Sequence, residues 1–129
     1  MSAPETNLPL PEIDGLDTAR GLQFFADRRG LYLRSLRQFV ELYGDGVASI
    51  DTLLSDAPGA SIEAARRDVH AVGGVGASLG ATGLERMARE FETLHRQAVP
   101  DSGTRALLSD FRDELARLVR DLRRQLPAD

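Results

Sequence analysis

The 129-residue chain contains no cysteine and no tryptophan, and because all 16 of its basic residues are arginine it has no lysine either. The absence of cysteine excludes disulfide bonds, thiolate catalysis and cysteine-ligated zinc. With only two histidines in addition, we do not expect a metal site. No site in this chain can draw on a lysine, which leaves arginine as its strong cation.

Aromatic residues make up 5% of the chain, and no apolar run approaches the length of a membrane span. A core with few aromatics must consist mainly of leucine, valine, isoleucine and alanine, which favours packed helices over a sheet. The formal net charge of −4 is not typical of a protein that binds nucleic acid. Because the first residues lack the basic start and apolar centre of a secretory signal, we expect a cytoplasmic protein without membrane insertion.

Apolar residues recur with helical spacing in five segments, which turn-forming residues separate. These are a short segment over 15–27 and long segments over 30–55, 62–79, 83–97 and 103–125. Asp14 or Asp17 is expected to cap the first, Ser61 to cap the third, and Gly80 to end it. Short connections make successive helices antiparallel neighbours. The sequence therefore predicts an all-α protein, an antiparallel up-down four-helix bundle with a short extra N-terminal helix.

Two features modify this outline. Gly44 and Gly46 fall inside the longest predicted helix and are expected to bend or split it. Residues 1–12 contain three prolines and little periodicity, so we expect a flexible N-terminal tail there. The bundle is then expected to span residues 13–126, without strands or internal repeats.

Residues 70–81, HAVGGVGASLGA, place four glycines directly after one of the two histidines. Each glycine within a helix costs about 1 kcal/mol relative to alanine, so their number needs a reason. The predicted inward stripe of this helix consists of Ile62, Ala65, Val69, Val72, Gly76 and Leu79. His70 lies at its edge, and Gly73 and Gly74 one turn later leave the ring on a bare patch, where unprotonated imidazole is a nucleophile near neutral pH. The alternative is a surface histidine beside glycines that only serve helix packing.

The segment EAARRDVHAVGGVGASLGATGLERMAREFETL, residues 63–94, resembles the histidine phosphotransfer (HPt) domain. That family carries a motif of roughly H-x-L-K-G, then small residues and L-G-A, on the second long helix of a four-helix bundle. The residues that match or are typical are His70, Val72, Gly74, Ala77, Leu79, Gly80 and Ala81, with Arg66 and Arg67 before the histidine. Residues 8–43 are similar to the family's leading segment, so the resemblance covers most of the chain.

The resemblance implies that His70 is a phosphoacceptor. It would take a phosphoryl group from the aspartyl phosphate of a response-regulator receiver domain and pass it to another receiver, in a relay with a hybrid sensor histidine kinase. Since the receiver would supply acidic residues and Mg²⁺, the chain is expected to be a monomeric carrier and not an enzyme, with no cofactor and no ATP site. The implied docking surface consists of Gly73, Gly74, Ala77, Arg66 and Arg67, completed by apolar residues such as Leu31 and Leu36.

One residue departs from the family pattern, because Gly73 replaces the motif lysine. A cation there would lean towards the ring and attract the incoming phosphoryl group, an effect of about 1 kcal/mol near a surface. An antiparallel hairpin at the following turn would place Arg89 opposite Gly73 and Glu92 opposite His70. Arg89 is therefore our candidate for a compensating cation, and a solvent-exposed arginine paired with Glu85 or Glu92 is the alternative.

Two other functions stay open on the sequence. A degenerate family member would bind a receiver, a kinase or an enzyme as an adaptor, without efficient phosphotransfer. A structural helical bundle would instead dimerise through its glycine-rich face. The second histidine, His95, lies near the end of its helix without small residues around it, and we interpret it as a surface residue.

Overall fold

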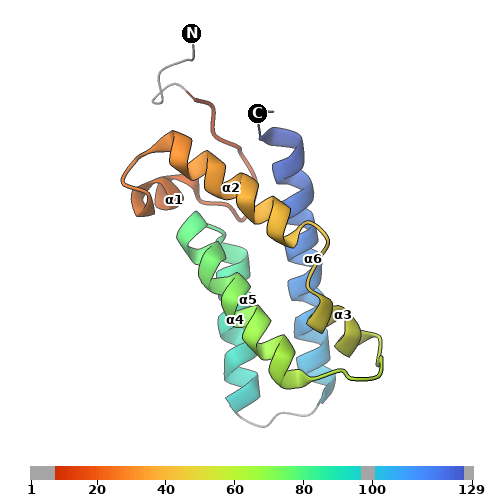
Figure 1. The fold of residues 1–129 in the computed structure, drawn as a ribbon. Helices are drawn as coiled ribbons and strands as arrows, with labels where there is room; N and C mark the ends of the chain where they lie inside the picture. The colour runs from red at the N-terminus through yellow and green to blue at the C-terminus, as the bar shows by residue number, and fades with distance from the viewer. Residues whose placement is uncertain (1–7, 97–100, 127–129) are drawn as a thin grey trace.

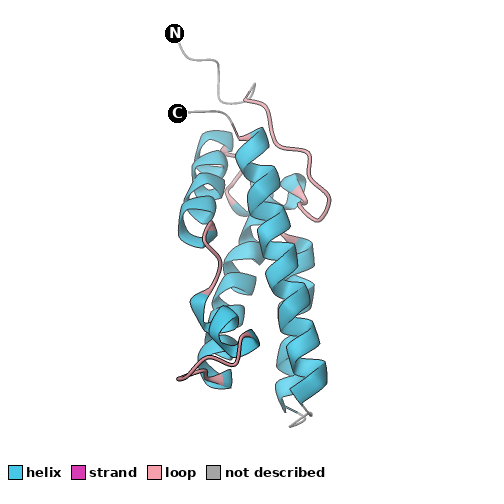
Figure 2. Ribbon diagram, turned by 90° about the vertical axis from the view of Figure 1, so that its right-hand side faces the viewer, coloured by secondary structure: helices cyan, strands magenta, loops and turns pink. Residues whose placement is uncertain are grey.

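The computed structural model describes residues 8–96 and 101–126, with side chains described for 8–94 and 102–126. Six helices lie within these residues (Figure 1): α1 (Thr18–Phe24), α2 (Arg29–Tyr43), α3 (Ala48–Leu54), α4 (Ile62–Leu79), α5 (Thr82–Arg96) and α6 (Asp101–Gln125). Helices and loops make up this part of the chain (Figure 2), and the predicted all-α class is confirmed. None of its helices is both long and apolar enough to cross a membrane.

The helices close into a bundle through a ring of neighbours. α4 packs against α5, and α5 packs against α6, while α2 and α3 each contact both α4 and α6. Figure 1 shows α4, α5 and α6 along the long axis of the molecule, with α2 across one end and α3 towards the other. Because α2 and α3 together take the place of one bundle helix, the predicted four-helix arrangement with a short leading helix is confirmed.

The helix predicted over 30–55 is two helices, because the chain turns after Tyr43. Gly46 has a φ of +86°, a left-handed conformation that residues with a side chain rarely adopt, and α3 begins two residues later. At Gly44, a Cβ would collide with the guanidinium of Arg123. The predicted helix is therefore split instead of bent, with the left-handed turn at Gly46 and close packing at Gly44.

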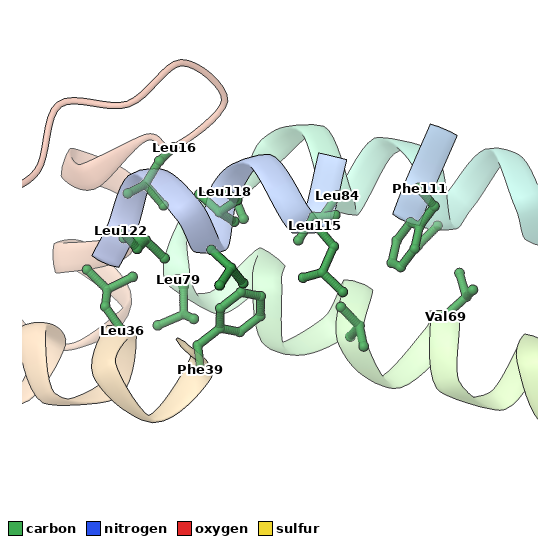
Figure 3. Close-up of a cluster of buried hydrophobic side chains, with 14 of the residues drawn as sticks. Leu16, Leu36, Phe39, Val69, Leu79, Leu84, Phe111, Leu115, Leu118 and Leu122 are labelled. Atoms are coloured by element: carbon green, nitrogen blue, oxygen red, sulfur yellow. The ribbon is translucent and has the colours of Figure 1, made fainter. Parts of the chain in front are cut away.

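The core is formed mainly by apolar side chains from α2 to α6, together with Leu16 ahead of α1 and Ala81 in the turn after α4. Figure 3 shows part of it, including Leu36, Phe39, Val69, Leu79, Leu84, Phe111 and Leu115. The predicted inward stripe of α4 is confirmed, with Ile62 partly buried and the other five members buried. Gly73 is buried as well, although it was not predicted to belong to that stripe.

Both ends of α4 follow the predicted capping pattern. Ser61 Oγ accepts a hydrogen bond from the backbone N–H of Ala64 at 3.2 Å, and Gly80 has a left-handed φ of +89° at the other end. The backbone N–H of Asp17 donates to the carbonyl oxygen of Gly80 at 2.7 Å. Of the two predicted caps of α1, Asp17 is the one used, since its carboxylate accepts from the N–H of Arg20 at 3.1 Å. The turn after α4 therefore holds the start of α1 directly.

α1 also packs closely on the C-terminal end of α4. A Cβ on the buried Gly21 would lie 2.5 Å from the carbonyl oxygen of Leu79 and 2.5 Å from the ring of Tyr32. The Tyr32 hydroxyl donates a hydrogen bond to the same carbonyl oxygen at 2.8 Å. Burial raises the pKa of Tyr32, and the nearby charge of Asp17 raises it further. These contacts fix α1 against the helix that carries His70.

Part of the predicted N-terminal tail lies against the bundle. The carbonyl oxygen of Leu8 accepts a hydrogen bond from Arg29 Nη1 at 2.8 Å. The backbone of Glu12 exchanges two hydrogen bonds with the Gln125 side chain, at 2.7 and 2.8 Å. Residues 1–7 of that tail lie outside the described residues, and the domain limits of 13–126 stay a prediction.

Candidate functional site

His70 lies in the middle of α4, at the border between its buried face and solvent. Its side chain is 73% exposed, and its Nδ1 is 2.6 Å from Oε1 of Glu92 on α5. The predicted opposition of these two residues across the α4–α5 hairpin is confirmed. Because a carboxylate can only accept a hydrogen bond, Nδ1 carries the proton, and Nε2 of the neutral ring keeps a free lone pair.

A hollow of about 210 Å³ opens beside the ring, between α4 and α5. Its lining consists of His70, Gly73, Gly74, Ala77, Glu85, Ala88, Arg89 and Glu92. We call this feature the histidine hollow. It brings the histidine together with the three small residues of the predicted docking surface and with the predicted compensating cation.

Gly73 and Gly74 contribute to the histidine hollow in different ways. A Cβ on Gly73 would lie 2.5 Å from the Cβ of Ala88, far inside van der Waals contact, whereas a Cβ on Gly74 would have no atom within 4 Å. Gly73 is therefore not the bare surface position that we predicted, because the methyl group of Ala88 on α5 packs directly against it. The motif lysine has no room at this position unless the two helices separate. The residue that faces Gly73 is Ala88, one position before the predicted Arg89.

Arg89 stands at the edge of the histidine hollow and is bound to Glu85. Its Nη2 is 3.0 Å from Oε2 of Glu85, four residues earlier on α5. The same carboxylate binds Arg20 of α1 through two atoms, with Nη1 3.2 Å from Oε1 and Nη2 3.4 Å from Oε2. One carboxylate that is 14% exposed thus holds two arginines from two helices. The alternative interpretation of Arg89, an exposed arginine paired with Glu85, describes its contact in this structure.

A second and larger groove, of about 660 Å³, runs between α1 and α4. Its lining consists of Arg20, Gln23, Phe24, Gly74, Val75, Ala77 and Ser78. Phe24 is 68% exposed and Val75 is also exposed, so two apolar side chains face solvent along the same groove. Because Gly74 and Ala77 line both features, this α1–α4 groove continues directly from the histidine hollow.

A comparison with protein families identifies this arrangement. The sequence model of the Hpt domain matches residues 34–125, which is 92 of the 129 residues. The chain belongs to the Hpt domain family. Hpt domains are histidine-containing phosphotransfer carriers of two-component signalling, and they interact with receiver domains and histidine kinases. Searches of curated proteins and of solved structures returned no match.

Two predicted docking residues of this Hpt domain lie away from the histidine hollow. Arg66 and Arg67 precede His70 by one turn, and neither is part of the lining described above. Arg66 Nε is 3.2 Å from Oε2 of Glu63, on the preceding turn. Helical side chains tilt towards the N-terminus, which carries both arginines away from the ring. Their role in docking stays a prediction.

The expectation for the apolar flank of the Hpt site was wrong in one respect. Leu36 is fully buried in the bundle core and cannot contact a partner, while Leu31 is partly exposed. The side chain of His95 lies outside the described residues. Among the side chains that are described, no three histidine, aspartate or glutamate residues are arranged to hold a metal ion.

The contribution of α1 to the Hpt site was not predicted from the sequence. Arg20 and Phe24 precede the residues that the family model matches, and nothing in the sequence alone places them beside Gly74 and Ala77. One signal was available, because Phe24 and Phe25 are adjacent and a helix cannot direct both rings into the same core. Phe25 is the partly buried one, and Phe24 faces solvent.

Proposed function

We propose that this Hpt domain carries a phosphoryl group on Nε2 of His70, between receiver domains. The contact that carries the proposal is the 2.6 Å hydrogen bond between Nδ1 and Glu92, on a ring that is 73% exposed. This contact selects the tautomer in which Nε2 is the nucleophile, on a side chain that is largely exposed. An ordinary surface histidine has neither a fixed tautomer nor a fixed ring.

In the proposed step, the Nε2 lone pair attacks the phosphorus of a receiver's aspartyl phosphate. The N–P bond forms as the P–O bond to aspartate breaks, and the electron pair of that bond stays on the receiver's carboxylate. Nδ1 keeps its proton throughout, so the phosphorylated ring is positively charged. The carboxylate of Glu92 faces this charge and stabilises it. Transfer to a second receiver is the same step in reverse.

The proposed docking surface is the open side of α4. Gly74 and Ala77 form a floor without projecting side chains beside the ring, and the α1–α4 groove adds the exposed Phe24 and Val75. A receiver must bring its aspartate to about 3 Å from Nε2, and a surface with low relief permits that approach. The partners we propose are a receiver domain and a hybrid sensor histidine kinase.

Transfer of ³²P from a phosphorylated receiver in the presence of Mg²⁺ tests the proposal. We expect acid-labile label on the wild-type chain and none on His70→Gln, whose side chain is exposed and leaves the core unchanged. Glu92→Gln should slow the labelling, because its amide can stabilise the positive ring only weakly. Glu90→Gln, a change at an exposed carboxylate on the same helix, is the matched control and should label at the wild-type rate.

The adaptor function has one observation in its favour, because Gly73 leaves no cation at the motif position. Receiver binding without any label on the wild-type chain would support the adaptor and contradict the carrier. If the chain neither binds a receiver nor accepts label, the structural bundle is the remaining alternative. The wild type should then dimerise through its glycine-rich face, and Gly74→Leu should change that oligomeric state.

A further inference from the structure

The site lacks a cation in the place where the family has one. Gly73 is closed by Ala88, and the chain contains no lysine at any position. A phosphoryl group on Nε2 brings about two negative charges next to the carboxylates of Glu92 and Glu85, and the protonated ring offsets only one of them. A cation must approach the hollow to offset this charge, and the described residues of its lining include one, Arg89.

Arg89 and Arg20 hold Glu85 unequally. Arg20 binds both carboxylate oxygens, in the two-point geometry that arginine forms best, while Arg89 makes one contact of 3.0 Å. The Arg89 side chain is also the more exposed of the two, at 74% against 51%. Arg89 is therefore the cation that can leave without much rearrangement.

We propose that Arg89 moves from Glu85 to the phosphoryl group when His70 is phosphorylated, while Arg20 stays on Glu85. This inference rests on the proposed function and assigns the missing lysine's role to an arginine from the opposite helix. Arg20 is a positioning residue in this scheme. Because Glu85 is largely covered, it would be costly to leave its charge unpaired, and the two-point contact with Arg20 prevents that when Arg89 leaves.

The same geometry gives Glu85 a regulatory effect on the site. In the unphosphorylated protein its carboxylate holds Arg89 at the edge of the hollow, and the ring stays accessible. After transfer, the phosphoryl group competes with Glu85 for the same guanidinium. α1 therefore influences the site from outside the matched family region, since it supplies the arginine that makes this exchange possible.

The chain offers a matched control for a general effect of surface charge. Arg86 and Glu90 form a pair with the same four-residue spacing on α5 but in the reverse order, at 3.8 Å, and the Arg86 side chain is 70% exposed. Neither residue lines the histidine hollow. The change in net charge that Arg89→Gln causes is therefore also caused by Arg86→Gln, at an arginine of similar exposure.

The experiment uses phosphoramidate, a small phosphoryl donor that needs no receiver, and follows phosphohistidine by ³¹P NMR. We expect Arg89→Gln to reduce the rate of phosphorylation about three- to tenfold and to raise the second pKa of the phosphoryl group, because the paired cation is lost. Arg89→Lys should restore most of both. Arg20→Gln should act in the same direction as Arg89→Gln but less strongly, since Glu85 then retains Arg89. Glu85→Gln should lower the phosphoryl pKa further.

The possible results separate the two proposals. If the wild-type chain is phosphorylated on His70 but Arg89→Gln matches Arg86→Gln in rate and in phosphoryl pKa, the exchange is wrong and the carrier function stands. If His70 of the wild type is not phosphorylated at all, both are wrong. Circular dichroism and urea unfolding of each variant show whether its fold is retained, so that a loss of rate caused by unfolding can be recognised.

Discussion

Gly73 and Gly74 are neighbours in the chain but belong to two different regions of the molecule. Gly73 lies in the seam between α4 and α5, where a single added carbon would lie 2.5 Å from Ala88. Gly74 lies on the open side of α4, where an added carbon would meet nothing within 4 Å. The pair shows that a run of glycines in a helix can serve two purposes, close packing on one side and low surface relief on the other.

The difference also gives the departure from the family motif a physical reason. A lysine at position 73 would require a larger distance between α4 and α5. The close packing of these two helices therefore explains why the motif lysine is absent. The cationic role then has to come from elsewhere, which is what we propose for Arg89. The open side at Gly74 retains the small-residue floor that the family motif also has.

The largest effect should follow a substitution in the seam. We expect Gly73→Ala to lower the free energy of unfolding by about 1–2 kcal/mol, although alanine is the better helix former by about 1 kcal/mol, because the helices must separate to admit the new carbon. Urea denaturation measures this. Ala88→Gly should relieve the clash in the double variant. A Gly73→Ala protein at least as stable as wild type would show that the seam is not closed.

A smaller effect is expected at Tyr32, where α2 meets the buried end of α4. Tyr32→Phe removes the hydrogen bond to the Leu79 carbonyl and should cost about 1 kcal/mol near neutral pH. Because the folded pKa is raised, this contribution is complete below the unfolded pKa of about 10 and declines as the pH rises above it. The stability gap to wild type should therefore narrow at about pH 11. The same difference in unfolding free energy between wild type and Tyr32→Phe near neutral pH and at about pH 11 would contradict this. Tyr43→Phe, at the other tyrosine of α2, serves as the control.

The smallest effect should occur on the open side of α4, with the opposite sign to that in the seam. Gly74→Ala is expected to raise the free energy of unfolding by about 0.5–1 kcal/mol, because alanine loses less backbone entropy in a helix and its methyl group meets no neighbour. Thermal unfolding measures this. If Gly74→Ala and Gly73→Ala change the stability in the same direction, the distinction between the two sides of α4 is wrong.

Much of the local structure could be predicted because it is encoded in residues that are close together in the chain. The inward stripe of α4, the cap at Ser61 and the helix end at Gly80 are of this kind. For α1 the sequence left Asp14 and Asp17 open, and the structure uses Asp17. The pairing of His70 with Glu92 followed from a hairpin whose turn is short. The register was correct to about one residue, and that residue separated Ala88 from Arg89 at the position facing Gly73.

The sequence by itself determined the all-α class, the order of the bundle helices, the residues at both ends of α4 and the identity of the phosphoacceptor candidate. Only the tertiary structure decided that Gly73 is closed, that the helix predicted over 30–55 is split, and that Arg20 and Arg89 share Glu85. The physical reason is that helix formation depends on residues close together in the chain, whereas helix packing depends on residues far apart in it. The 3.6-residue turn of a helix is set by its own backbone, whereas the distance between two helices depends on every side chain packed between them. Arg20 and Glu85, which are 65 residues apart, meet only after that packing is complete.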